Sequence, residues 1–281
     1  GVFRRQRQMC IRDSLSAARP DLSITLSSQV CPEIREYERQ STACANAYVQ
    51  PLMSRYLTKL DEALQSMGFM CPFLLMTSGG GLTTLDTSIK FPVRLVESGP
   101  AGGAILATEI AKECGIDNVL SFDMGGTTAK ICLIDDYTPQ MTRTFEVARV
   151  YRNLKGSGLP LRIPAIEMVE IGAGGGSIAK VDDMKRISVG PESSGASPGP
   201  ACYGQGGLDA TVTDADVILG RIDPKDFAGG AVKLAPEKAD LVLQKAVGDQ
   251  LSLDSSLSAF GVSEIVDENM ANAARVHAIE W

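Results

Sequence analysis

Histidine is almost absent from this sequence of 281 residues, in which His277 is the only one. A Ser-His-Asp or Cys-His enzyme would have to be built around that single residue, and a histidine-rich metal site cannot be built at all. His277 follows Val276 in a segment with helical periodicity, where a structural role is the more common one. The scarcity of histidine therefore excludes one class of metal site and disfavours the triad hydrolases.

Cysteine pairs at CxxC spacing are absent as well. The seven cysteines are scattered, at positions 10, 31, 44, 71, 114, 132 and 202. Without a CxxC pair, zinc and redox motifs have no support, and an odd number of unpaired cysteines suits the reducing cytoplasm. No apolar run reaches the length of a transmembrane helix. These absences predict a cytoplasmic protein that has no membrane partner.

Basic charge is in the minority, and the formal net charge is -7. Residues 1–14 are the exception, because they hold four arginines and one aspartate. The acidic body argues against a nucleic-acid partner, which would require a basic face. Residues 1–14 also lack the apolar core of a signal peptide and show no periodicity. We predict that this segment is foreign to the protein or disordered, and that it can be removed.

Strand-like and helix-like segments alternate along the rest of the chain, which indicates an α/β class. Pro51 should divide a long helical stretch into two pieces, while Ser98 and Gly115 should cap and end a later helix. The expected elements are a strand over 22–30, a helical stretch over 33–67, a buried strand over 73–77, a helix over 98–115, two strands over 118–136, further strands to 189, a Gly/Pro/Ser-rich loop over 190–210, and helices over 235–247 and 262–279.

The segment FDMGGTTAKICLID holds the strongest functional signal. It predicts a strand that ends at Asp123, a tight reversal at Gly125 and Gly126, and a second strand after Thr127 and Thr128. Glycine permits positive φ and lets backbone N–H groups approach phosphate oxygens, and the threonine hydroxyls add donors. The carboxylate at the strand end can hold Mg²⁺ through water, as a catalytic and metal-binding group. Walker and Rossmann loops would lead into a helix, so neither fits; an ordinary Gly-Gly hairpin is the alternative.

Two further clusters are rich in glycine. In EIGAGGGSIAKVD, the run Gly174, Gly175 and Gly176 is either a nucleotide contact or a point where two chain segments cross closely, and the sequence favours neither. The segment VGPESSGASPGPACYG suits a rigid lid or binding loop. Its Cys202 could be a nucleophile, but a packing role is favoured because no histidine lies near it in the sequence.

These clusters, together with TVTDAD and LGRIDP, occur in an order and spacing that resemble the hydantoinase A/5-oxoprolinase family over about residues 21–281. LSSQVCPEIREYERQSTACANAYVQPLM resembles the opening of that family's central domain. The resemblance implies an actin/hexokinase-type (ribonuclease H-like) ATPase domain, with a mixed sheet flanked by helices. It also implies that residues 15–281 are a partial domain, because family chains carry an N-terminal domain with a second Asp-Gly-Gly-Thr hairpin and a C-terminal Gly-rich segment.

The resemblance further implies ATP- and Mg²⁺-dependent hydrolysis of a small cyclic amide, such as 5-oxoproline, hydantoin or N-methylhydantoin, through a phosphorylated substrate. Two alternatives remain open: an ATP-using subunit of an acetone- or acetophenone-type carboxylase, and an actin-like nucleotide-binding module without chemistry of its own. A second subunit of the hydantoinase B type is an expected partner. Family members often place Ser/Thr-Asp after GGT, where this chain has Thr128, Ala129 and Lys130. A carboxylate that could assist Asp123 in metal binding is therefore missing. The isolated chain is expected to be inactive.

Overall fold

The computed structural model describes residues 2–34, 36–148, 150 and 156–279. The chain folds into two compact units. The first unit holds residues 1–119 and 134–167, and the second holds residues 120–133 and 168–281. Each unit is described below by itself.

The first unit begins with helices. Two of them lie where the sequence predicted something other than a helix. Residues 1–14 were expected to be foreign to the protein or disordered; residues 2–14 lie in helix α1, Val2–Ala18, whose described side chains are mostly exposed, and a foreign origin stays a prediction. The expected strand over 22–30 is wrong, because the segment is extended chain followed by helix α2, Ser27–Val30. Its polar side chains bond to a helix instead of a sheet: Asn46 donates to the Thr25 hydroxyl over 2.9 Å.

Helix α3, Glu36–Ser66, is continuous, so the predicted division at Pro51 is also wrong. Proline removes one N–H from the helix ladder and normally kinks or breaks it. Pro51 lies on the exposed side of α3, where water can hydrogen-bond to the carbonyl that loses its donor. The buried side of α3 packs through Ala43 into a core with Val30, Val93, Leu161 and Ile163.

A hairpin and three helical segments follow α3. Strands β1, Leu74–Met76, and β2, Leu82–Thr84, pair antiparallel around the predicted glycine turn, although β1 is only partly buried. Next come α4, Leu85–Lys90, the 3₁₀ turn η1, Pro92–Leu95, and α5, Ser98–Cys114. Gly115 ends α5 in the left-handed region as predicted, but Glu97 and not Ser98 occupies the N-cap position.

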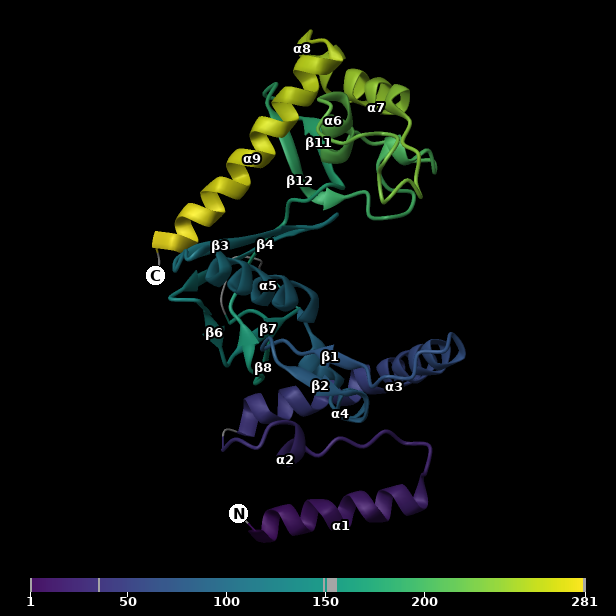
Figure 1. Ribbon diagram of the computed structural model, residues 1–281, viewed down its shortest axis with the longest axis vertical. Coiled ribbons are helices and arrows are strands. Elements are labelled where there is room, and N and C mark those ends of the chain that lie inside the picture. The colour runs from purple at the N-terminus through teal and green to yellow at the C-terminus, as the bar shows by residue number, and fades with distance from the viewer. Residues whose placement is uncertain (1, 35, 149, 151–155, 280–281) are drawn as a thin grey trace. The chain divides into compact units, whose positions relative to one another are not determined.

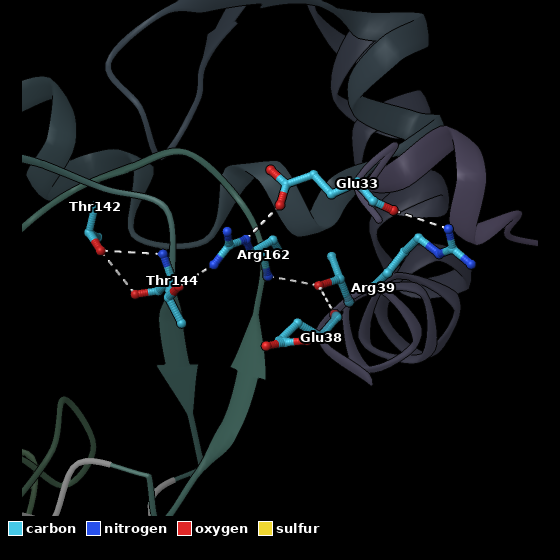
Figure 2. A network of polar contacts seen from close by, with 7 residues as sticks. Glu33, Glu38, Arg39, Thr142, Thr144 and Arg162 are labelled. Atoms are coloured by element: carbon cyan, nitrogen blue, oxygen red, sulfur yellow. Dashed lines mark hydrogen bonds and ion pairs between the residues drawn. The ribbon is translucent and has the colours of Figure 1, made fainter. Parts of the chain in front are cut away.

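Short antiparallel strands complete the first unit: β5 Thr138–Pro139, β6 Met141–Thr142, β7 Phe145–Val147, β8 Leu159–Leu161 and β9 Ala165–Ile166. Strand β6 pairs with β9, and β7 pairs with β8. Figure 2 shows how Arg162, just after β8, reaches both Glu33 and Thr144. Its guanidinium donates to Glu33 over 2.6 Å and to Thr144 over 2.9 Å, which links the chain before α3 to these strands.

The second unit is built on strands β3, Val119–Met124, and β4, Ala129–Asp135, whose first and last residues respectively extend into the first unit. The sheet has the order β10-β4-β3, in which β10 is Val169–Ile171, and β5 also pairs with β4. A second antiparallel pair joins β11, Ser177–Val181, to β12, Ile187–Ser193. The predicted strand, turn and strand over 118–136 is therefore confirmed.

Helices cover these strands in the second unit. They are α6 Val212–Ile218, α7 Pro236–Leu243, α8 Asp249–Leu251 and α9 Ser255–Ile279, with the 3₁₀ turn η2 Ala201–Tyr203 before them and the π-helical turn η3 Gln244–Gly248 after α7. Figure 1 shows α9 lying along β12, and the two elements contact each other. The last two predicted helices are confirmed, and α9 starts earlier than expected. Among the described residues, no helix combines the length and the apolar character that crossing a membrane requires.

Candidate functional site

The predicted phosphate hairpin lies between β3 and β4. Asp123 is the penultimate residue of β3, and its side chain is exposed. The turn closes when the Gly125 amide donates to the Thr128 carbonyl over 2.9 Å. The structure thus brings Asp123, Gly125 and Thr128 together in one exposed reversal, as the sequence predicted.

The tip of this hairpin offers hydrogen-bond donors. Gly125, Gly126 and Thr127 are all exposed. Within the described part of the chain, the amides of Gly126 and Thr127 donate to no carbonyl or side chain. A Cβ atom at Gly126 would meet no atom within 4 Å. Successive amides in a turn can bind an anion, and the absence of a side chain at Gly126 leaves the approach to them open.

One part of the sequence argument for these glycines needs correction. Positive φ was expected at the reversal, but neither Gly125 nor Gly126 is among the glycines in that region. A Cβ at Gly125 would lie 3.3 Å from the Thr128 carbonyl oxygen, a tight contact that the backbone would have to shift to relieve. The backbone conformation therefore does not require glycine at Gly126, and the open space above it is what a side chain would fill.

The glycine run of the second cluster lies directly against the hairpin. Gly175 donates its amide to the Gly125 carbonyl over 3.1 Å, and Gly176 donates to the Gly126 carbonyl over 2.6 Å. Gly174 donates to the Ser177 hydroxyl over 2.9 Å. All three amides of the run are thus already engaged within the protein, so they are not free donors for a phosphate.

Close backbone approach explains why glycine is needed in this run. A Cβ at Gly174 would lie 2.6 Å from the Gly125 carbonyl oxygen, and one at Gly176 would lie 2.9 Å from the Gly126 carbonyl oxygen. Real Cβ atoms essentially never come this close to backbone atoms. Of the two roles that the sequence left open, the close crossing is the one that the geometry displays, and direct contact with nucleotide stays a prediction.

Helix α6 and the segment after β12 hold the glycine run from its other side. The amide and the hydroxyl of Thr213 each donate to the Gly175 carbonyl over 2.8 Å. Ser194 donates its amide to the Gly176 carbonyl over 2.8 Å. Neither Thr213 nor Ser194 could be predicted as a partner of the glycine run, because a hydrogen bond between segments far apart in the chain has no local signature in the sequence.

Asp214 fixes the start of α6. Its side chain is fully buried and accepts the Thr211 hydroxyl over 2.7 Å and the Thr211 amide over 3.0 Å. It also accepts the amides of Cys202 over 2.8 Å and Ala201 over 3.3 Å. Thr211 caps Asp214 in return, which makes a capping box. A buried carboxylate is tolerated when donors surround it as they do here, and TVTDAD contained the signal for this cap.

Cys202 is a packing residue in this arrangement. Its side chain is fully buried in a core with Val217, Leu234 and Ala239. Burial, followed by the nearby Asp214 carboxylate, raises the pKa of the Cys202 thiol far above its ordinary value. The thiolate that a nucleophile requires is therefore strongly disfavoured, which supports the packing interpretation of this cysteine.

The other candidate groups do not assemble into a second site. His277 is buried on α9, with 4% of its surface exposed, in agreement with the structural role expected for it. Among the described residues, no three His, Cys, Asp or Glu side chains are grouped so as to hold a metal ion. Metal binding by Asp123 stays a prediction.

Fold and hairpin together define an α/β domain of the actin-like ATPase type. The profile of the Hydantoinase/oxoprolinase family matches residues 39–279, and the chain belongs to that family. It is 39% identical over 92% of its length to an uncharacterized protein of Methanocaldococcus jannaschii, and 35% identical over 98% of its length to caprolactamase subunit alpha of Pseudomonas jessenii. The chain spans 38% of the length of each of these relatives.

A solved structure extends the comparison. The nucleotide-free structure of acetone carboxylase, described as an enzyme of ATP-dependent acetone carboxylation, matches 97% of this chain with a TM-score of 0.78 at 25% identity. The chain covers 37% of that protein chain. The expected family and α/β fold class are therefore confirmed. In place of the predicted mixed sheet, the described residues form several small sheets with antiparallel pairings, flanked by helices.

Proposed function

We propose that this chain is the part of a larger enzyme that binds the phosphates of ATP, and that the enzyme uses ATP to hydrolyse a small cyclic amide. The observation that supports the proposal is the exposed hairpin at 123–128, in which the amides of Gly126 and Thr127 make no hydrogen bond among the described residues while the glycine run packs against the Gly125 and Gly126 carbonyls. Membership of the Hydantoinase/oxoprolinase family and the likeness to caprolactamase subunit alpha support the substrate class.

Each hairpin residue has a role in the proposal. Gly125 and Gly126 let the backbone approach the phosphates, and Thr127 and Thr128 add amide and hydroxyl donors. Asp123 fits Mg²⁺, which commonly keeps several waters and binds one or two carboxylates together with substrate phosphates. When bound, the ion would neutralise charge on the phosphates. Gly174, Gly175 and Gly176 act here as the backing of the hairpin.

The proposed reaction begins when the amide oxygen of the ring attacks the γ-phosphorus and the bond to the ADP oxygen breaks. Water then adds to the activated ring carbon, and the carbon–nitrogen bond breaks to leave an acyl phosphate and a free amine. A second water converts the acyl phosphate into a carboxylate and inorganic phosphate. The hairpin contributes by positioning the phosphates and stabilising their charge, which is most of what catalysis of phosphoryl transfer requires.

A second candidate function is the phosphorylating subunit of a carboxylase. The TM-score of 0.78 to acetone carboxylase favours it, because the same hairpin could present ATP to an enolate oxygen. Either function is compatible with a partner subunit of the hydantoinase B type, since relatives of this chain are named as subunits. ATP hydrolysis stimulated by a lactam, or by a ketone with bicarbonate, separates the two candidates.

The hairpin is tested with Gly126→Val and Asp123→Asn in the full-length enzyme. Gly126→Val should weaken ATP binding while the melting temperature stays close to wild type, because the space at Gly126 is open on the protein side. Asp123→Asn should lower turnover roughly 10²-fold, the scale of losing one electrostatic group at a reacting centre, with a smaller effect on ATP affinity.

Asp135→Asn is the matched control, because Asp135 is an exposed carboxylate at the other end of β4. Asp135→Asn should leave both the ATP affinity and the turnover unchanged. ATP affinity and turnover at wild-type values in both hairpin variants would remove the phosphate assignment and leave an ordinary hairpin.

A further inference from the structure

We propose that Thr213 is a positioning residue for the phosphate hairpin, acting through the peptide groups of Gly175. The inference rests on the proposed function, since it assumes that the hairpin at 123–128 binds phosphate. Thr213 lies in the first turn of α6, and the hydrogen bonds that connect it to the hairpin pass through Gly175. It is therefore not a catalytic residue.

Two hydrogen bonds from Thr213 converge on one acceptor. Its amide and its hydroxyl both donate to the Gly175 carbonyl oxygen, each over 2.8 Å. On the other side of the same residue, the Gly175 amide donates to the Gly125 carbonyl over 3.1 Å. The Gly125 amide in turn closes the hairpin on Thr128. A chain of hydrogen bonds therefore runs from α6 to the reversal of the hairpin.

Thr213 and Gly175 are closely packed within this chain of hydrogen bonds. Thr213 is 6% exposed, so water cannot readily replace its hydroxyl. A Cβ at Gly175 would lie only 2.7 Å from the Thr213 hydroxyl oxygen, which shows how closely the two residues meet. The start of α6 is itself fixed, because the buried Asp214 carboxylate binds Thr211, Ala201 and Cys202. Because the start of α6 is fixed, the two hydrogen bonds from Thr213 restrict movement of the Gly175 carbonyl.

Thr213→Val isolates the hydroxyl. Valine has nearly the shape of threonine and keeps the amide bond to Gly175, so only one of the two donors is lost. The Gly175 carbonyl would then be held less firmly, and with it the neighbouring amides of Gly175 and Gly176, which donate to the Gly125 and Gly126 carbonyls. Because the amides at Gly126 and Thr127 follow directly in the chain, their position relative to a phosphate should become less defined.

The test measures the KM for ATP, kcat and the melting temperature in the full-length enzyme. Thr213→Val should raise the KM for ATP about three- to tenfold, the range expected from one neutral hydrogen bond. Thr213→Ser keeps the hydroxyl and should restore the KM to within about twofold of wild type. The matched control is Thr108→Val, because Thr108 is a buried threonine that donates to the Ala104 carbonyl over 2.9 Å in the first unit.

Thr108→Val should lower the melting temperature about as much as Thr213→Val does, with the KM for ATP unchanged. A wild-type KM in Thr213→Val, an equal rise in Thr108→Val, or no rescue by Thr213→Ser would each overturn the inference. If Thr213→Val does not fold, Gly175→Ala replaces it, because its methyl group displaces the same hydroxyl and should raise the KM; an unchanged KM would again overturn the inference.

Failure of this inference differs from failure of the proposed function. If Asp123→Asn and Gly126→Val are impaired while Thr213→Val is not, the hairpin binds phosphate and only the positioning role is lost. If all three variants behave as wild type, the phosphate assignment itself has failed.

Discussion

The amide of Gly176 donates a hydrogen bond to the carbonyl oxygen of Gly126 over 2.6 Å. Two glycine clusters that are far apart in the sequence therefore meet backbone to backbone. In the first cluster, the amides of the exposed residues Gly126 and Thr127 make no hydrogen bond among the described residues, whereas the amides of Gly175 and Gly176 in the second cluster donate to carbonyls of the first. Glycine thus serves two purposes in one site: open space in front of the hairpin and close approach behind it.

This division of roles predicts that two glycine substitutions change the free energy of unfolding by different amounts. Gly174→Ala should destabilise the protein by about 1–3 kcal/mol, the usual effect of forcing an extra methyl group into a packed site, because its Cβ would lie 2.6 Å from the Gly125 carbonyl oxygen. Gly126→Ala should change stability by less than about 0.5 kcal/mol, as for an ordinary surface substitution. Urea unfolding of both variants measures the difference, and equal stabilities would contradict the crossing geometry.

The buried hydrogen bonds of Thr42 are expected to stabilise the first unit. The fully buried Thr42 hydroxyl accepts the Arg162 amide over 2.8 Å and donates to the Glu38 carbonyl over 2.6 Å. Thr42→Val leaves that amide without its acceptor and should cost about 1–3 kcal/mol of unfolding free energy. Thr42→Ser keeps the hydroxyl and should cost clearly less. A Thr42→Val protein as stable as Thr42→Ser would show that the bond contributes nothing.

Cys202 predicts a pH dependence of stability. Burial and then Asp214 raise the pKa of its thiol in the folded protein, whereas the thiol of the unfolded chain ionises near about pH 8.5. Above that pH the unfolded state loses the proton and the folded state keeps it, so stability falls as pH rises, by about 1.4 kcal/mol per pH unit for one group. Cys202→Ala should remove this part of the slope between pH 9 and pH 10.

Unfolding free energies at the two pH values, measured for wild type and Cys202→Ala, give the slope directly. The other ionising groups are common to both proteins and cancel in the difference. Identical slopes would mean that the Cys202 thiol ionises as readily in the folded protein as in the unfolded one.

Residues 1–14 are predicted to be dispensable, although residues 2–14 belong to α1. Most side chains of this helix that the structure describes are exposed, including Met9 and Leu15. Deleting the segment should therefore cost less than about 1 kcal/mol of unfolding free energy, in the range of surface changes. A larger loss, measured by thermal or urea unfolding of the shortened chain, would make α1 part of the fold.

The hairpin was predictable from sequence because its signals are local. Alternating apolar residues on both sides of Gly125 and Gly126 predict two strands and a reversal, and the structure has them. The capping box of Thr211 and Asp214 also has a local signal in the sequence, because a threonine is followed three residues later by a residue with a carboxylate. Features decided within a few residues of one another can be derived from pattern alone.

Features decided by distant partners could not be derived in this way. The β-rich composition of residues 22–30 suggested a strand, yet the hydroxyls of Ser23 and Thr25 bond to Gln50 of α3, and no partner strand adjoins them in the described residues. Pro51 should end a helix by local rules, but its exposed position lets α3 continue. The backing role of Gly174 depends on a backbone that the chain reaches only after folding.

The single carboxylate of Asp214 binds both ends of one surface loop, at Cys202 and at Thr211. The residues between these anchor points are largely exposed, Leu208 among them. Closing a loop costs free energy that grows only slowly with its length. Extra residues inserted beside Leu208 should therefore leave both anchor points in place, which makes this loop a suitable place to graft a peptide tag or a short recognition sequence.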